Sequence, residues 1–166
     1  MERRAFRTAL VATGNTDDAL DLVQDAMLDF ARRYAVRPEG EWGVLFHRTL
    51  HSRITDWYRR SSVRNRFRVW FGGKDGEEDE NPLEKLPDEG GADPARALEN
   101  RQTAAAITAA LRKLPMRQRQ AFLLRAWEGL DVAQTAFAMG CSEGSVKTHY
   151  SRAVHALRTL LEEYRS

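Results

Sequence analysis

Cysteine occurs once in this 166-residue chain, at position 141, and proline only five times. A single thiol excludes an intramolecular disulfide framework and a zinc site built from cysteine alone, so we expect a reducing, intracellular setting. Long hydrophobic runs are also missing. The N-terminal run TALVA is too short for a signal-peptide core, and no stretch approaches the length of a membrane span. We therefore expect a cytoplasmic protein with no membrane insertion.

The chain as a whole has no large excess of positive or negative charge, but its segments do. The total is 26 Lys and Arg against 24 Asp and Glu. Residues 1–74 carry 14 basic and 9 acidic side chains, residues 75–100 carry 2 and 10, and residues 101–166 carry 10 and 5. Two basic segments flanking an acidic one indicate a polyanionic partner, although ordinary surface charge around a solvated loop explains the same pattern.

The acidic segment also separates the chain into parts. It holds three of the five prolines and can bury little apolar surface, which favours a flexible linker over residues 68–99. On either side the apolar residues follow helical spacing, and no strand alternation is evident. The sequence thus predicts an all-α protein of two small helical domains, residues 1–67 and 100–166, joined by this acidic flexible linker.

Two helices are predicted in the N-terminal domain. The first begins after Asn15, a favourable N-cap, and the second covers about residues 44–60. In the second helix Arg53 falls inside the apolar stripe, where we expect its stem to pack and its guanidinium to reach water. The predicted core stripes are Leu20, Val23, Met27, Phe30 and Tyr34 in the first helix and Phe46, Leu50, Ile54 and Trp57 in the second.

The C-terminal domain has the pattern of a helix-turn-helix. A short helix with Val132, Ala136 and Met139 on one side is followed by a glycine-containing turn at 140–142 and a longer helix. Projection at 100° per residue turns small, polar and basic residues of the longer helix away from its apolar stripe. A solvated amphipathic helix is the alternative. The candidate DNA-contacting residues are Gly144, Ser145, Lys147, Thr148, Ser151 and Arg152.

Further surfaces are predicted in the N-terminal domain. The helix at 44–60 carries a polar, basic side that continues into the run RRSSVRNRFR, a composition suited to single-stranded or distorted nucleic acid. The helix after Asn15 turns an acidic, leucine-bearing side outward, which indicates a protein partner, although a plain solvated side competes with this reading. The polar, basic side of the helix at 44–60 carries Arg48, His51, Ser52, Thr55 and Arg59, and Arg60 follows in the basic run. The acidic side of the helix after Asn15 carries Asp18, Asp21, Leu22, Asp25, Leu28 and Asp29.

In combination, these segments resemble a known family. DLVQD at 21–25, LFHRTLHSRITDWYRR at 45–60, an acidic linker, LPMRQR at 114–119 and GCSEGSVKTHYSRAVHAL at 140–157 are similar to the extracytoplasmic-function (ECF) class of bacterial sigma factors. The resemblance implies a transcription initiation factor with core RNA polymerase and promoter DNA as partners and an anti-sigma factor as a third candidate partner. It implies no enzymatic activity and no cofactor.

The resemblance also implies residue roles. It assigns the minus-35 element to the helix-turn-helix residues named above and the polymerase to Asp18, Asp21, Leu22, Gln24, Asp25 and Leu28. The loop at 35–41 and the helix at 44–60 would read the minus-10 element. The minus-10 residues are then Arg37, Arg48, His51, Ser52, Thr55, Arg59 and Arg60.

Three other functions remain as alternatives, one of which is a pure interaction protein that binds polymerase without reading a promoter. A stand-alone helix-turn-helix regulator would bind DNA as a dimer, but it leaves residues 1–70 without a role. An enzyme would need a site, and His47 and His51, one helical turn apart, are the only metal-like pair. No third ligand is evident beside them, so we expect an exposed pair, no metal and no catalysis.

Overall fold

The computed structural model describes residues 2–70 and 94–165, and within these ranges the regular elements are all helices. The chain divides into two compact units, Met1–Glu80 and Asn81–Ser166, which we call unit 1 and unit 2. The predicted all-α class is confirmed. None of the described helices combines the length and hydropathy needed to cross a lipid bilayer.

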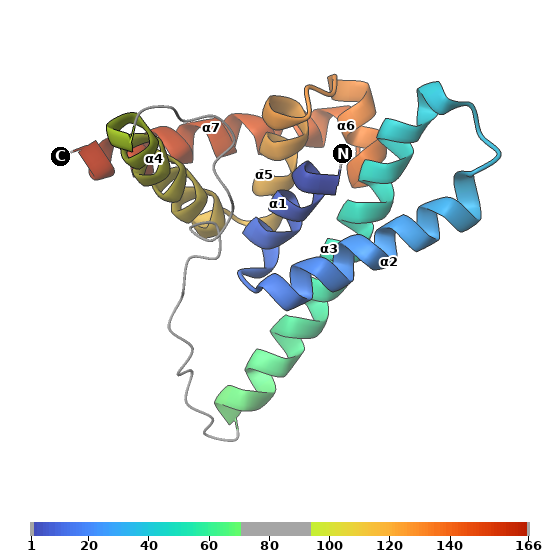
Figure 1. Ribbon diagram of the computed structural model, residues 1–166, viewed down its shortest axis with the longest axis horizontal. Coiled ribbons are helices and arrows are strands. Elements are labelled where there is room, and N and C mark those ends of the chain that lie inside the picture. The colour runs from blue at the N-terminus through green and yellow to red at the C-terminus, as the bar shows by residue number, and fades with distance from the viewer. Residues whose placement is uncertain (1, 71–93, 166) are drawn as a thin grey trace. The chain divides into compact units, whose positions relative to one another are not determined.

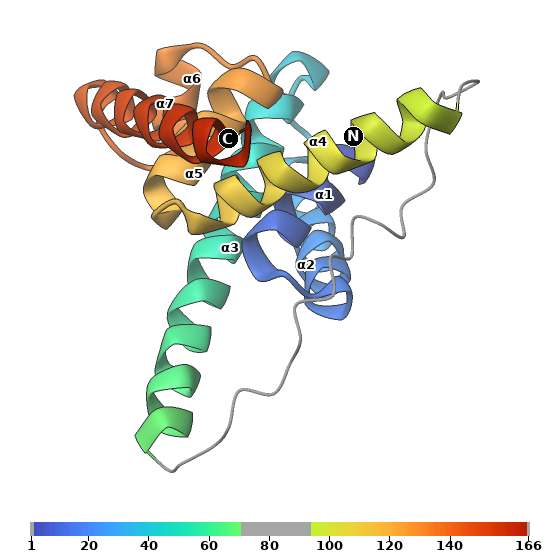
Figure 2. The ribbon, with the colours of Figure 1, turned by 90° about the vertical axis from the view of Figure 1, so that its left-hand side faces the viewer.

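Unit 1 is built from three helices: α1 (Glu2–Thr13), α2 (Thr16–Tyr34) and α3 (Glu39–Trp70). Each packs against the other two, and Figure 1 shows α1 beside α2 and α3. Asn15 caps α2 as predicted, since its side chain accepts a hydrogen bond from the Asp18 amide at 3.1 Å. Figure 2 shows the C-terminal part of α3 extending beyond α1 and α2.

Two predictions for unit 1 were incomplete or wrong. The helices predicted from the sequence included no counterpart of α1, although Ala5, Ala9 and Leu10 are part of the core. On α2, Leu20 and Met27 were expected inside but are 45% and 39% exposed. The buried side of α2 is instead formed by Ala19, Leu22, Val23 and Ala26, because small side chains let neighbouring helices approach closely.

Unit 2 consists of α4 (Pro94–Lys113), α5 (Met116–Phe122) with a π-helical turn at Leu123–Trp127, α6 (Val132–Met139) and α7 (Glu143–Arg165). The predicted break at Leu114-Pro115 separates α4 from α5. Helix α7 packs against α4, α5 and α6. The core of this unit includes Ala121, Leu124, Ala136, Ala138, Met139 and Val146.

Both ends of the predicted linker, residues 68–99, are helical. Helix α3 continues to Trp70, and α4 begins at Pro94, so residues 68–70 and 94–99 are helical. Proline suits the first helical position because its missing amide hydrogen is not needed there. The rest of the predicted linker lies outside the described residues.

Candidate nucleic-acid interface

The turn between α6 and α7 is fixed by local sequence. Asp131 and Gln134 form a capping box at the start of α6, with bonds of 2.7 and 3.0 Å between each side chain and the other's amide. Gly140 ends α6 at φ 66°, a left-handed conformation that favours glycine. Ser142 then caps α7 by accepting a hydrogen bond from the Ser145 amide at 3.1 Å. The predicted helix-turn-helix is therefore present.

Two arginines hold this motif to the rest of unit 2. Arg117 donates to the Met139 carbonyl at 2.8 Å, which ties α5 to the C-terminal end of α6. Arg125 donates to the Leu130 carbonyl at 2.7 Å, and its guanidinium lies 5.5 Å from the centre of the Tyr150 ring on α7. Both arginines satisfy backbone carbonyls at a helix end or turn. Spacing in the sequence did not reveal these contacts.

The orientation predicted for α7 is confirmed. Val146, Ala153 and Leu157 are buried, whereas the candidate DNA-contacting residues are exposed, apart from half-buried Ser145. Gly144 has open space around it, since only the Ser142 hydroxyl oxygen would come within 4 Å of a Cβ at this position, so a DNA backbone or base edge can approach there. The N-terminal end of α7 thus offers hydroxyl, ammonium and guanidinium groups, which bind base edges and phosphates.

Helix α3 carries the second candidate surface. Its residues Arg48, Ser52, Arg59 and Arg60 are exposed, as predicted. Thr55 is half-buried, and its hydroxyl donates to the His51 carbonyl at 2.9 Å within the helix. Arg48, Arg59 and the Ser52 hydroxyl share one side of α3 and can bind phosphates there. Arg60 projects close to Arg53 instead and lines a hollow beside α2.

The prediction for His51 was wrong. His51 is 2% exposed and His47 is 8% exposed, so neither lies on the exposed polar side of α3. The pair was expected to be exposed but is buried. Helix α3 packs against α1 as well as α2, which makes its buried arc wider than the stripe visible in the sequence. The two imidazole rings lie 6.5 Å apart. Among the described residues, no three His, Cys, Asp or Glu side chains are grouped so as to hold a metal ion.

The connection before α3 is anchored by an aromatic side chain. The Trp42 indole donates to the Arg37 carbonyl at 2.9 Å, and its ring packs edge-on against Phe30 on α2. Helix α3 begins at Glu39, so the predicted loop at 35–41 includes the first residues of the helix. Arg37 itself is exposed beside the start of α3.

The outer side of α2 is acidic. Asp21, Gln24, Asp25 and Leu28 are exposed, with Leu28 55% exposed, and Asp18 is half-buried. Leu22 was expected on this side, but it is 7% exposed and packs inward. A hollow of about 140 Å³ lies between this side of α2 and α3. It is lined by Asp18, Asp21, Leu22 and Asp25 on α2 and by Arg53, Trp57, Arg60 and Ser61 on α3.

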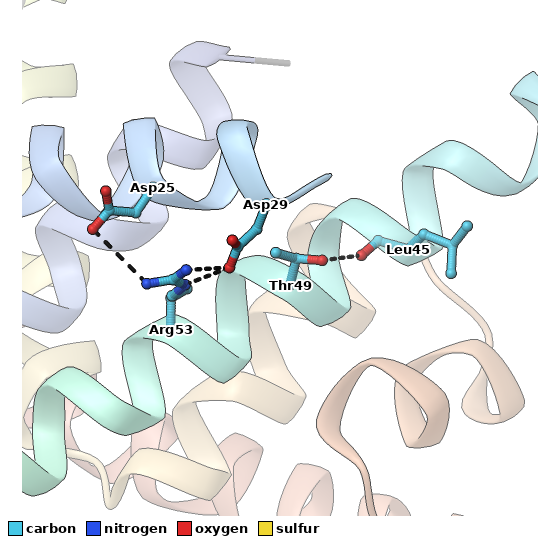
Figure 3. A network of polar contacts seen from close by, with 5 residues as sticks. All are labelled: Asp25, Asp29, Leu45, Thr49 and Arg53. Atoms are coloured by element: carbon cyan, nitrogen blue, oxygen red, sulfur yellow. Dashed lines mark hydrogen bonds and ion pairs between the residues drawn. The ribbon is translucent and has the colours of Figure 1, made fainter. Parts of the chain in front are cut away.

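An ion pair joins α2 to α3 beside this hollow. The Arg53 guanidinium donates through Nε at 2.8 Å, and also through Nη2, to one carboxylate oxygen of Asp29, and its Nη1 lies 3.9 Å from Asp25 (Figure 3). The hydrogen bond from Arg53 lowers the pKa of Asp29 below its usual value, since it stabilises the charged carboxylate. The sequence predicted that this guanidinium reaches water. It instead binds two carboxylates on α2.

Comparisons with known proteins cover both units. The family model for sigma-70 region 4 matches residues 104–157. An RNA polymerase sigma-E factor of Streptomyces avermitilis is 33% identical over 145 residues, 87% of this chain and 72% of that protein. The ECF RNA polymerase sigma factor SigL of Mycobacterium tuberculosis is 32% identical over 95% of this chain and 82% of its own length.

A solved structure shares the fold. It is the sigma factor RpoE of Bartonella quintana in complex with the anti-sigma factor NepR, with a TM-score of 0.66 and 23% identity. The match covers 97% of this chain and 91% of that one.

Proposed function

The chain belongs to the ECF class of RNA polymerase sigma factors, which are transcription initiation factors, and we propose that its surfaces divide the work of promoter selection. Unit 1 binds core RNA polymerase through the acidic side of α2 and reads the minus-10 element with α3 and Arg37. Unit 2 reads the minus-35 element with the N-terminal end of α7. The corresponding domains are residues 1–67 and 100–166, with the intervening segment as a tether.

One observation carries this proposal. The N-terminal end of α7 follows a capped, left-handed turn and exposes Lys147, Thr148, Ser151 and Arg152, while its opposite side is buried. This is the geometry in which a helix-turn-helix places its second helix in a major groove. A stand-alone regulator would use the same helix but is not favoured, because the curated relatives match across unit 1 as well.

The acidic side of α2 supports the polymerase contact. Exposed carboxylates beside exposed Leu28 form a surface that repels DNA but can pair with a basic, partly apolar protein surface. The chain then acts in the cytoplasm as an initiation factor, and the bond-forming chemistry belongs to the polymerase.

An anti-sigma factor is a further proposed partner. The structurally similar protein from Bartonella quintana was solved with such a partner bound. A protein that occupied the acidic side of α2 would compete with the polymerase for the same carboxylates. Binding of this kind would keep the chain inactive until the partner is released.

A transcription experiment tests the proposed function. Purified full chain is added to sigma-free bacterial core RNA polymerase on genomic fragments, and transcript 5′ ends are mapped. We expect discrete start sites that neither the core nor the chain produces alone, and only weak promoter binding by the free chain in gel shift. Failure to form a complex with the core, or an absence of defined starts, would contradict the proposal.

A further inference from the structure

Arg53 is a charged residue in an apolar stripe. Phe46, Leu50 and Ile54 on α3 are each at most 3% exposed, and at 100° per residue Arg53 projects into the same arc. Its side chain meets Asp29 and Asp25, which lie one turn apart on α2 (Figure 3). The contact therefore crosses the interface between the two helices at a site where an apolar residue would be expected.

The energetics of such a pair favour specificity over stability. The side chains of Arg53 and Asp29 are 32% and 20% exposed, so both charges lose part of their hydration. Desolvation offsets part of the Coulomb attraction in such a pair, and an apolar replacement of similar volume is often neutral for folding. A planar guanidinium, however, matches a carboxylate in few orientations. The pair therefore restricts how α3 can rotate against α2.

Rotation of α3 matters for the side facing away from Arg53. Arg48 and Thr55 project to the opposite side of the helix, and Arg59 projects close to it. A turn of α3 about its axis would move these side chains together relative to any DNA that unit 1 holds. The donors of Arg53 itself are directed to carboxylates, which disfavours a direct contact between this guanidinium and a phosphate.

We propose that Arg53 is a positioning residue for promoter reading, whose ion pair with Asp29 holds α3 in the rotation that presents its polar side to the minus-10 element. This inference rests on the proposed function. It assigns to Arg53 a role that is separate from minus-35 reading, and Asp29→Asn, which leaves Asp25 in place, separates that role from polymerase binding.

Variants of the full chain, bound to core polymerase, test the inference. Arg53→Met removes the charge and keeps most of the volume, Arg53→Lys keeps the charge without the planar fork, and Asp29→Asn weakens the pair from the other side. Arg33→Met is the matched control, because exposed Arg33 acts on Asp29 through its charge without a hydrogen bond. Urea unfolding of each variant identifies any that fail to fold.

The readout is base discrimination at each promoter element. A fragment selected by the wild-type holoenzyme is compared with versions that carry single-base changes in the minus-10 or the minus-35 element, and core affinity is measured by fluorescence anisotropy. We expect Arg53→Met and Asp29→Asn to lose about tenfold in minus-10 discrimination, while minus-35 discrimination and core affinity stay within about twofold. Arg53→Lys should fall between, and Arg33→Met should match the wild type.

Two results would overturn the inference. One is unchanged minus-10 discrimination in folded Arg53→Met or Asp29→Asn. The other is an equal loss at both elements, which a general loss of structure would produce. A wild-type chain that gives no defined start sites would instead contradict the proposed function, so the two failures are distinguishable.

Discussion

Helices α7 and α3 carry the two proposed DNA-reading surfaces, but they obtain their outward sides differently. The turn before α7 is fixed by residues within a few positions of it, namely Asp131, Gln134, Gly140 and Ser142. The buried arc of α3 is set by contacts with both α1 and α2. A surface defined by local capping can be read from sequence, whereas one defined by two neighbouring helices depends on packing.

The largest effect is expected on α7. Replacing both Lys147 and Arg152 by Glu should reduce minus-35-dependent transcription about 100-fold, because each lost base or phosphate contact costs roughly 1–3 kcal/mol. Transcription by the reconstituted holoenzyme measures this. Arg158→Glu is the control, since Arg158 is exposed on the same side of α7 three turns further on. An equal loss of transcription in the double variant and in Arg158→Glu would contradict a special role for the N-terminal end of α7.

On α3, replacing an exposed residue should impair promoter opening, whereas replacing a buried residue should lower the stability of the fold. Arg48→Ala should lower open-complex formation about tenfold through a lost phosphate contact and leave unfolding unchanged. His51→Ala should instead reduce the free energy of unfolding by roughly 1–3 kcal/mol, because it removes a buried side chain. Permanganate reactivity of the promoter and urea unfolding report these quantities. A stable His51→Ala chain with impaired opening would show that the buried position is misassigned.

Helix caps provide a smaller contrast between the units. Asp131→Ala removes the capping box of α6, and Asn15→Ala removes the cap of α2, each at a cost of about 1 kcal/mol. Hydrogen exchange resolved along the chain should show the loss of protection in unit 2 for the first and in unit 1 for the second. Asp131→Asn serves as the control because asparagine caps equally well. Loss of protection in both units from one change would mean that they do not unfold separately.

The smallest predicted effect is a pH dependence in unit 1. Because Arg53 lowers the pKa of Asp29, the pair stabilises the fold above the ordinary aspartate pKa of about 4, and this contribution is lost as the pH falls through the lower native value. Asp29→Asn should lack this part of the acid destabilisation. Urea midpoints between about pH 6 and pH 3 measure it. Identical acid profiles for the wild type and Asp29→Asn would contradict the assignment.

The helical class and the helix-turn-helix were predictable because their evidence is local. Caps, a glycine in the left-handed region and 3.6-residue periodicity lie within α6 and α7. The sides of α2 were misread because Ala19 and Ala26, rather than Leu20 and Met27, form the close contact. The partner of Arg53 was not predictable, since Asp29 lies 24 residues away on another helix.

Position-specific crosslinking within the holoenzyme tests the division of promoter reading between the units most directly. A photoreactive side chain replaces Ser52 in one variant and Lys147 in another, and the crosslinked bases are mapped on one promoter fragment. The account predicts crosslinks around the minus-10 element from position 52 and around the minus-35 element from position 147. Crosslinks from both positions to the same element, or to polymerase in place of DNA, would contradict it.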